Sequence, residues 1–399
     1  MRVLLLNEYY PPDTSATAHM AAQVAEAIAQ RHEVTVLAGR PSYDPTERHP
    51  YYLLRREIRN GVRVERVGST AYSRLRMRRR VTNYLSYLAL AIPRALAIPA
   101  DVVLAMTDPP FAGMAGALVA RLRGLPFVYN IRDLYPDMAL GGEIVRPSWM
   151  VDHWEKLHRR ALKRAARVIV LGEDMRDRIV GKGVDPARVA VVRDGVSVPE
   201  TLASREHPVA QEIRCGFPFA VVHAGNLGFY GAWETLVRAA RLLEADGVGF
   251  VFVGEGAQRA QVEAAANGCR AVRLLPFRPR EEVPYVMAAG DLHVVTVKRG
   301  LEGVVVPSKM YSIMAAGRPV LAVAPEESDV VRIVRREGCG VAADPDRPES
   351  VAEAVRQVLQ DPAHRAEMGR RAREVARKHD KVGELQLFLR TLEEAAREG

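Results

Sequence analysis

Short β-branched apolar runs alternate along the chain with segments of helical periodicity. In the first half the runs predict strands at Arg2–Asn7, His32–Ala38, Val62–Val67, Asp101–Ala105, Pro126–Asn130, Arg167–Leu171 and Val189–Val192. Helices are predicted between them, including Ala18–Gln30, Ala112–Leu122 and about Trp154–Ala166. Buried strands separated by helices are typical of right-handed βαβ units in an open parallel sheet.

The same alternation restarts after residues 199–217. Further strands are predicted at Ala220–His223, Gly249–Val253, Val272–Leu275, Leu292–Val297, Val320–Val323 and Gly340–Ala343. The sequence therefore predicts an α/β protein with two doubly wound domains, at residues 1–205 and 206–382, followed by a helix at residues 383–399. Ligands of such sheets bind beyond the carboxyl ends of the strands, so candidate site residues should directly follow strands.

Composition and charge narrow the class of protein. A chain of 399 residues, 48% apolar and 26% charged, is globular and too long for one ordinary core. The net charge of +9 suits an anionic partner, which could be nucleic acid, an acidic membrane surface or a phosphorylated small molecule. Three scattered cysteines favour neither a disulfide framework nor a zinc cluster.

Neither a signal peptide nor a spanning helix is expected. Asn7 and Glu8 end the first apolar run, and Pro93 and Arg94 interrupt the longest one. That stretch, residues 84–98, is shorter than the roughly 20 residues that a spanning helix needs. We therefore expect a cytoplasmic protein that could rest on a membrane without crossing it.

Glycine-rich turns follow two strands of the second half. The loop 224–231 (AGNLGFYG) and the turn Gly254-Glu255-Gly256 would let the backbone approach a ligand closely. Leu275-Pro276-Phe277 follows the next strand and could press on a flat base. Tight turns and a core phenylalanine explain these segments equally well on local grounds.

The segment 298–309 (KRGLEGVVVPSK) is the most informative of the second half. Pro307 is typical of the first position of a helix, predicted to run to Ala316. The N–H groups of residues 303–306 (Gly303, Val304, Val305 and Val306) and of this helix could face an anion, with Lys298 and Lys309 nearby. A surface cluster of salt bridges that includes Glu302 is the alternative.

Polar residues also follow strands of the first half. The candidates are Tyr9, Asp13, Thr14, Ser15, Asp108, Arg132 and Asp133. Small hydroxyl residues before a helix commonly cap it, so at least one of these is expected to be an N-cap. Ligand contact and ordinary turn chemistry both remain open for the others.

Five arginines lie within Arg74–Arg80, and the aromatic and apolar residues 84–90 follow them. This combination suits an anionic bilayer surface. A solvated loop that leads into a core helix is the alternative. Nucleic acid is a third option, but no helix-turn-helix, RRM or zinc pattern accompanies the arginines.

These segments, in this order and covering nearly the whole chain, resemble glycosyltransferase family 4. The segments are LLLNEYYPPDTSATAHM, DVVLAMTDPP, YNIRDLYPD, HAGNLGFYGAWETL, FVGEGAQR, LLPFRPREEVP and EGVVVPSKMYSIMAAGRPVLA. The resemblance implies a retaining transferase of the GT-B fold, in which two Rossmann-like domains face each other across a cleft. It also implies that the last helix, residues 383–399, returns to the N-terminal domain. More narrowly, the chain resembles the bacterial surface-polysaccharide branch, such as N-acetyl-fucosamine transferases.

The resemblance also implies substrates and site residues. The donor would be a nucleotide-sugar, typically UDP-linked, with Leu275 and Phe277 at the base and Gly225 and Asn226 at the diphosphate. Glu302 would stand for the first glutamate of the family's E-x7-E motif, facing the donor sugar. The remaining residues assigned to donor binding are Glu255, Lys298, Gly303, Val304, Val305, Lys309 and Ser312.

In the first half, Arg132 occupies the place where many relatives have a histidine near the reacting sugar, with Asp133 beside it. Tyr9, Asp13, Thr14, Ser15 and Asp108 would then contact the acceptor.

The chain departs from the family pattern at several of these positions. Ser312 stands where many members have the second glutamate, and Glu302 precedes it by ten residues rather than eight. Asn226 and Tyr230 replace the usual arginine and lysine. We therefore assign the diphosphate charge to Lys298, Lys309 and the helix N-terminus, and expect no metal or other cofactor.

The expected function is retaining transfer of a sugar to a lipid-linked or polysaccharide acceptor at the inner membrane face. Front-face attack would explain retention without an obvious nucleophile. The alternatives are a natural-product transferase with a soluble acceptor, a non-catalytic nucleotide-sugar-binding protein, and an epimerase of the same fold.

Overall fold

A computed structural model describes residues 1–42, 50–72 and 76–398. The chain forms two compact units: the first comprises Met1–Leu140, Val145–Val192 and the chain from Leu385 onward, and the second comprises Gly141–Ile144 and Arg193–Glu384. The chain thus leaves the first unit before the predicted boundary at residue 205. It returns to that unit beside the predicted boundary at residue 382.

The first unit is built on an eight-stranded sheet in the order β3-β4-β2-β1-β5-β6-β7-β8. Its strands are β1 (Arg2–Leu6), β2 (Glu33–Ala38), β3 (Leu54–Arg59), β4 (Val62–Val67), β5 (Val102–Ala105), β6 (Phe127–Asn130), β7 (Arg167–Val170) and β8 (Val189–Val191). The expectation of a wholly parallel sheet is wrong at one edge, because β3 pairs antiparallel with β4. The sequence of β3, LRREIR, is almost entirely exposed, so it lacks the apolar run of a buried strand.

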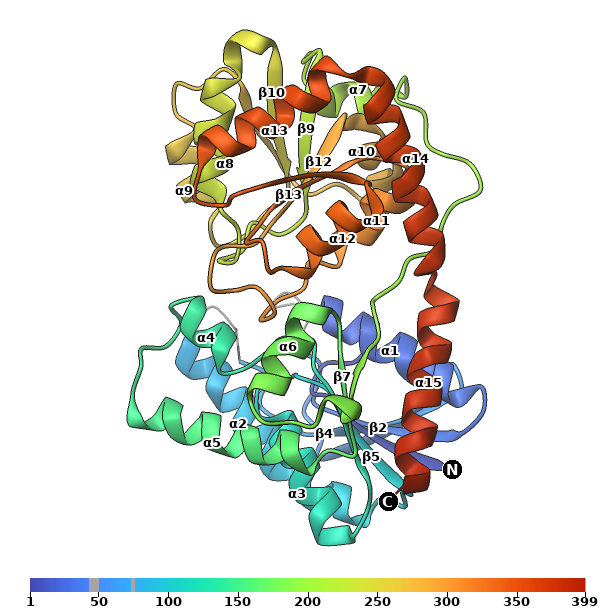
Figure 1. Ribbon diagram of the computed structural model, residues 1–399. Helices are drawn as coiled ribbons and strands as arrows, with labels where there is room; N and C mark the ends of the chain where they lie inside the picture. Colours follow the sequence, from blue (N-terminus) through green and yellow to red (C-terminus); the bar gives the residue numbers. More distant parts are fainter. Residues whose placement is uncertain (43–49, 73–75, 399) are drawn as a thin grey trace. The chain divides into compact units, whose positions relative to one another are not determined.

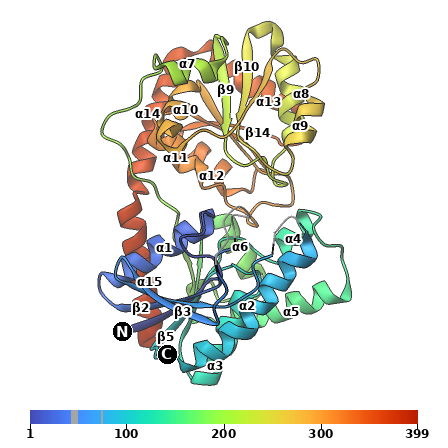
Figure 2. The same cartoon turned by 180° about the vertical axis from the view of Figure 1, so that it is seen from behind.

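Helices cover both faces of this sheet. Helices α1 (Ala16–Ala29) and α15 (Lys381–Glu398) share one apolar core with it. On the other side lie α2 (Met77–Ala97), α3 (Ala112–Arg123) and α5 (Trp149–Arg164), as Figure 1 and Figure 2 show. Two shorter helices, α4 (Asp137–Gly141) and α6 (Glu173–Gly181), complete the unit. The ion pair between Arg167 and Glu398, at 2.5 Å, ties the end of α15 to β7.

The second unit has a six-stranded parallel sheet in the order β11-β10-β9-β12-β13-β14. Its strands are β9 (Phe219–Ala224), β10 (Val248–Val253), β11 (Val272–Leu275), β12 (Leu292–Thr296), β13 (Val320–Val323) and β14 (Gly340–Ala343). Counted along the unit this is the order 3-2-1-4-5-6 of a Rossmann fold, whose strand order reverses between β9 and β12. The prediction of two doubly wound units is confirmed.

The helices of the second unit pack in groups against the sheet. They are α7 (Pro208–Arg214), α8 (Trp233–Leu242), α9 (Arg259–Ala265), α10 (Val283–Ala289), α11 (Lys309–Ala315), α12 (Asp329–Glu337), α13 (Pro348–Gln360) and α14 (Pro362–Lys378). Short 3-10 turns occupy Glu244–Asp246 and Arg280–Glu282 in this unit and Pro186–Arg188 in the first unit. Helix α11 begins at Lys309 after Ser308, two residues later than predicted from Pro307, and α5 begins at Trp149, earlier than predicted.

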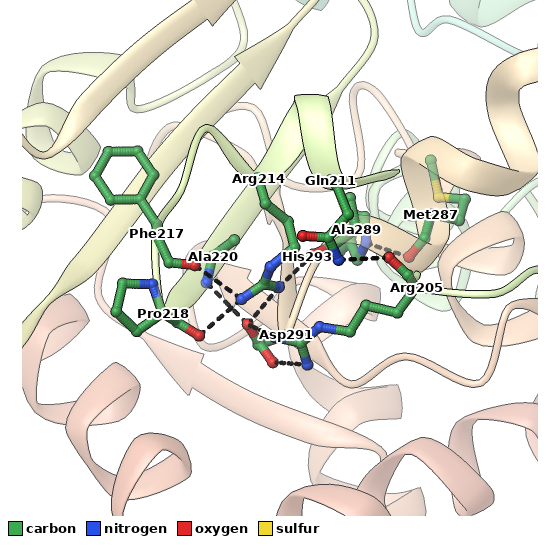
Figure 3. Close-up of polar contacts among 10 residues, drawn as sticks. All are labelled: Arg205, Gln211, Arg214, Phe217, Pro218, Ala220, Met287, Ala289, Asp291 and His293. Carbon is green, nitrogen blue, oxygen red and sulfur yellow. Dashed lines mark hydrogen bonds and ion pairs between the residues drawn. The ribbon is translucent and has the colours of Figure 1, made fainter. Parts of the chain in front are cut away.

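A buried charge network holds the amino-terminal end of this sheet (Figure 3). Asp291, just before β12, accepts hydrogen bonds from the Arg214 guanidinium at 2.9 Å and from Ala220 N at 2.9 Å. Arg205 pairs with the same carboxylate at 2.8 Å. Arg214 also donates to the carbonyl oxygens of Phe217, Pro218 and Ala289. Both carboxylate oxygens of Asp291 and both terminal nitrogens of Arg214 therefore have hydrogen-bond partners.

Candidate active site

The glycine-rich loop after β9 lies at the point where the strand order of the second unit reverses. Gly225 N donates to Val253 O at 2.8 Å, and Leu227 N donates to Glu255 O at 2.8 Å. These bonds tie the loop after β9 to the turn after β10. Two strand ends of one sheet edge thereby form a single backbone surface, which is the usual ligand position in such sheets.

Glycine is required where these two loops touch. Gly254 has a φ of +152°, and a Cβ built there would lie 2.0 Å from Gly225 O. A Cβ on Gly256 would lie 2.4 Å from Leu227 O. At these two positions glycine is needed because one loop packs against the other. This agrees with the alternative that these segments are tight turns. Gly225 differs, because the atom nearest to a Cβ there is the Lys309 Nζ at 3.1 Å.

Lys309 reaches this loop from the start of α11. Its Nζ lies 3.2 Å from Nε2 of His223, the residue two before Gly225. Among the described residues, the Lys309 side chain has no other hydrogen-bond partner. Burial lowers the pKa of Lys309 to about 7, because an ammonium group loses hydration there without gaining a carboxylate. Lys309 and Gly225, both assigned to the diphosphate from the sequence, thus lie side by side.

His223 is a site residue that sequence reasoning missed. Its side chain is 1% exposed, and its ring meets the Trp233 ring edge-on at a centroid distance of 4.7 Å. Burial, and then the neighbouring Lys309, lower the pKa of His223 well below its usual value. Trp233 Nε1 donates to Gly228 O at 2.7 Å, so the loop, the histidine and the lysine pack as one group. The available signal was a polar residue inside an otherwise apolar strand.

Lys298 borders the same glycine-rich loop at its far end, where Lys298 N donates to Tyr230 O at 2.7 Å. It is exposed and lines a cavity of about 550 Å³ beside the first residues of α8 and the helix α9. Within the described residues we find no contact between Lys298 and Lys309. The assignment of both lysines to one diphosphate stays a prediction, and the structure favours Lys309 as its central member.

The loop before α11 differs from the predicted arrangement. Val304 N donates to Leu301 O at 3.1 Å and Val305 N donates to the same oxygen at 3.4 Å, and both valine side chains are buried. These two N–H groups therefore donate within the loop, and contact with an anion, which stays a prediction, would require them to give up these hydrogen bonds. Gly303 has a φ of +67°, and Glu302 Oε2 accepts from Gly300 N at 2.7 Å.

The other residues predicted to bind the donor differ in their exposure and in their neighbours. Phe277 follows β11 with 55% of its side chain exposed, and Leu275 is half-buried. Asn226 and Glu255 are exposed, and Glu255 pairs with Arg259 at 3.2 Å. Ser312 lines a separate cavity of about 680 Å³, formed with the linker 196–207 and helix α10.

The strand order of the first unit reverses between β1 and β5, and predicted acceptor residues lie there. Glu8 N donates to Asp108 O at 2.7 Å, which joins the loops after the two strands. Asp13 Oδ1 accepts from Ser42 N at 2.9 Å. Ser15 is the N-cap of α1 and accepts from Ala18 N at 3.0 Å, so the expected capping role falls to Ser15. Thr14, beside it, is exposed.

Tyr135 marks where further polar residues meet. Burial raises the pKa of Tyr135, and the carboxylates of Asp133 and Asp108 raise it further, so the loops after β5 and β6 converge at this ring. Arg80 acts on the same hydroxyl in the opposite sense. Arg132 is half-buried beside these groups in sequence. Sequence reasoning did not assign Tyr135 a role, because an aromatic residue before proline is equally typical of a core position.

Tyr9 packs in a small buried cluster with Ala18 and Tyr84. Tyr84 belongs to α2 and accepts a hydrogen bond from Arg80 Nε. The start of α2 therefore borders the predicted acceptor residues of the first unit.

The basic segment leads into α2. Of Arg74–Arg80, Arg74 lies outside the described residues, Arg76 precedes the helix, and Arg78 and Arg79 are exposed on its first turn. Exposed apolar side chains recur every four residues along the helix, at Met77, Val81 and Leu85. On α5, which also packs on α3, Trp149 is 77% exposed. None of the helices within residues 1–42, 50–72 and 76–398 combines the length and apolar character needed to cross a bilayer.

Asp344-Pro345-Asp346 forms a turn. Both carboxylates pair with Arg299, at 3.0 and 2.6 Å, and Asp346 N donates to Asp344 Oδ1 at 2.9 Å. In the described part of the chain no group of histidine, cysteine, aspartate and glutamate side chains has the arrangement of a metal site.

Two Rossmann-like units, each with polar loops at the reversal point of its sheet, define the GT-B class of fold. Residues 15–195 match the family model "Glycosyl transferase 4-like domain", and residues 216–375 match "Glycosyl transferases group 1". The chain is therefore a glycosyltransferase with a GT-B fold. The expected enzyme class, a glycosyltransferase, is confirmed.

Relatives from several bacteria carry glycosyltransferase names. WcaI of Escherichia coli K12, assigned to colanic acid biosynthesis, is 24% identical over 91% of this chain and 93% of its own length. WbjE of Pseudomonas aeruginosa is 27% identical over 65% of this chain and 66% of its own length. The 2-deoxystreptamine glucosyltransferase of Streptomyces kanamyceticus is 28% identical over 72% of this chain and 78% of its own.

Solved structures share the fold over the whole chain. HepE of Anabaena, solved in complex with UDP, superposes with a TM-score of 0.69 at 16% identity and covers 99% of this chain and 100% of its own. WaaG, a glycosyltransferase involved in lipopolysaccharide biosynthesis, gives a TM-score of 0.67 at 19% identity, covering 98% of this chain and 99% of its own.

Proposed function

We propose that this glycosyltransferase moves a sugar, with retention, from a UDP-sugar to a lipid-linked or polysaccharide acceptor. The observation that carries the proposal is Lys309, a cation without a carboxylate partner, beside Gly225 at the reversal point of the second sheet. An unneutralised cation at this position suits a diphosphate. UDP is the ligand named for the HepE structure of the same fold.

The second unit would hold the donor. Lys309 would donate to the diphosphate oxygens, with Gly225 and Asn226 at the same turn. The exposed ring of Phe277, after β11, would lie against the uracil. By resemblance to the polysaccharide branch, the sugar would be a HexNAc or deoxy-HexNAc such as N-acetyl-fucosamine, with Glu302 facing it.

The first unit would hold the acceptor beside Tyr9, Asp108 and Asp133. In front-face transfer the bond from the anomeric carbon to the diphosphate oxygen breaks, and the acceptor hydroxyl oxygen bonds to that carbon on the same face. The hydroxyl proton passes to the leaving phosphate oxygen. The protein's contribution is to stabilise the negative charge on the departing diphosphate and to fix both substrates at close range. Arg132, after β6, would add positive charge near the reacting centre.

A lipid-linked acceptor places this enzyme at a membrane surface. Exposed arginines at the start of α2 and the apolar side chains Met77, Val81 and Leu85 give this helix the character of an interfacial one. Binding to vesicles with anionic lipid, weakened by salt and by exchange of Arg78 and Arg79 for glutamine, supports a peripheral position at the inner membrane face. Equal binding to neutral vesicles contradicts it.

A soluble small-molecule acceptor is the second candidate. It is favoured by the relative named as a 2-deoxystreptamine glucosyltransferase, which aligns with 72% of this chain. Absence of vesicle binding, together with transfer to a soluble amino sugar, would select this candidate over the first.

The test of donor binding is calorimetry with UDP in the presence of EDTA. We expect Lys309→Met to weaken UDP binding by about 1 to 3 kcal/mol, because a charged hydrogen bond to phosphate is lost. Lys298→Met is the matched comparison, and a loss of similar size there would restore Lys298 to the diphosphate site. A folded wild-type protein that binds neither UDP nor UDP-sugars would refute the proposed function.

A further inference from the structure

Two basic nitrogen atoms lie within hydrogen-bond distance at the proposed diphosphate site. Lys309 Nζ is 3.2 Å from His223 Nε2. Two cations cannot share such a short distance in a buried place, so at most one of the pair is protonated. When the lysine holds the proton, Nε2 accepts its hydrogen bond and the imidazole proton resides on Nδ1.

The surroundings of the pair keep the imidazole neutral. His223 is enclosed by the rings of Trp233 and Phe252, at centroid distances of 4.7 and 6.2 Å. The other titratable group that acts on it is His293 of the neighbouring strand β12, whose own pKa burial lowers to about 4. No carboxylate among the described residues contacts Lys309 or His223. Nothing in this part of the site therefore fixes a positive charge before a ligand arrives.

We propose that His223 is a positioning residue, whose neutral ring holds the Lys309 amine at the Gly225 turn, and that this amine takes up a proton when a nucleotide diphosphate binds. This inference rests on the proposed function, because it needs a diphosphate beside Lys309. A carboxylate in place of His223 would keep the ammonium charged and would compete with the phosphate oxygens for it. A neutral acceptor fixes the position of Nζ and leaves its charge to the ligand.

The test is UDP binding by calorimetry, with the proton count taken from two buffers that differ in ionisation enthalpy. UDP is fully ionised above about pH 7, because the last phosphate pKa is near 6. Between about pH 7 and about pH 8.5 we expect uptake approaching one proton, and an affinity that falls by up to about tenfold per pH unit. Lys309→Met should bind UDP more weakly and without proton uptake.

Two exchanges at residue 223 separate positioning from packing. His223→Gln keeps an acceptor at the end of a side chain of similar reach, and it should retain most of the wild-type affinity. His223→Phe keeps a ring of similar volume without the acceptor, and it should weaken UDP binding at least fivefold while the melting temperature stays within a few degrees. Equal affinity of His223→Phe and wild type overturns the role of His223.

The remaining outcomes distinguish this inference from the proposed function. UDP binding with no proton uptake and the same affinity at both pH values overturns the inference and leaves the donor assignment intact. Failure of the folded protein to bind UDP at either pH overturns the donor assignment, and the inference falls with it.

Discussion

The two ends of the second sheet treat buried charge in opposite ways. At the amino-terminal end the Asp291 carboxylate is met by two guanidinium groups and a backbone N–H. At the carboxyl end the Lys309 amine meets only a neutral ring among the described residues. The first arrangement satisfies its charges internally and stabilises the fold. The second leaves an amine without a counter-charge, so a proton that it holds in the free protein costs stability, and a bound anion would favour that proton.

The largest effect is expected from breaking the paired end with Arg214→Leu. This change leaves the buried Asp291 carboxylate and several carbonyl oxygens without their donor, and should lower the free energy of unfolding by about 3 to 5 kcal/mol. Urea denaturation measures the change. Arg205→Leu, at a partly exposed guanidinium, is the control and should cost about 1 kcal/mol or less. Equal losses of unfolding free energy in the two variants would contradict the expectation that the more buried arginine contributes more to stability.

An intermediate effect is expected from Gly254→Ala at the opposite end. The added Cβ would lie 2.0 Å from Gly225 O at a φ of +152°, so the two loops must separate. We expect about 2 kcal/mol of destabilisation together with weaker UDP binding. Gly181→Ala is the matched control, because a Cβ at that helical position meets nothing within 4 Å. A stable Gly254→Ala variant with unchanged UDP affinity would contradict the required contact.

The last effect has the opposite sign. Lys309→Met removes an amine whose protonation near pH 6 costs the free protein stability, so at that pH the variant should be more stable than wild type. The folded pKa near 7 lies below the unfolded value of 10.5, and the unfolded state therefore binds more protons between these two values. The penalty on wild type is full below pH 7 and fades as the pH rises through this window. Urea denaturation at pH 6 and at about pH 10 should show the difference shrinking; a constant difference would mean that Lys309 is not desolvated.

The sequence predicted the parallel strands well, because each is a short segment rich in aliphatic residues, most of them β-branched; β5 (VVLA) is entirely apolar, whereas β4 (VRVERV) alternates valine with charged residues. Positions after strands also led to Gly225 and Lys309, which the structure brings together. The edge strand β3 was not predicted, because its polar sequence has no buried face. His223 was not predicted as a site residue for a different reason. Its partner, Lys309, is 86 residues away in sequence, and the contact depends on how α11 packs beside β9.

The anion contacts of Val304 and Val305 stay a prediction, and the sequence did not reveal that both N–H groups donate within their own loop. Local spacing does not reveal which carbonyl oxygen receives each hydrogen bond. The same limit applies to Lys298, whose neighbours depend on where the first turn of α8 and helix α9 lie.

Helix α15 has a consequence for the order in which the protein matures on the ribosome. Phe388, Leu389 and Leu392 fill the core of the first unit, although residues 1–192 of that unit are made long before them. The apolar surface that α15 covers stays open to water until residues 385–398 have been synthesised. The chain from Arg193 to Glu384 can close its own core earlier. The unit begun first is thus finished last, and its apolar surface remains open while residues 193–384 are made.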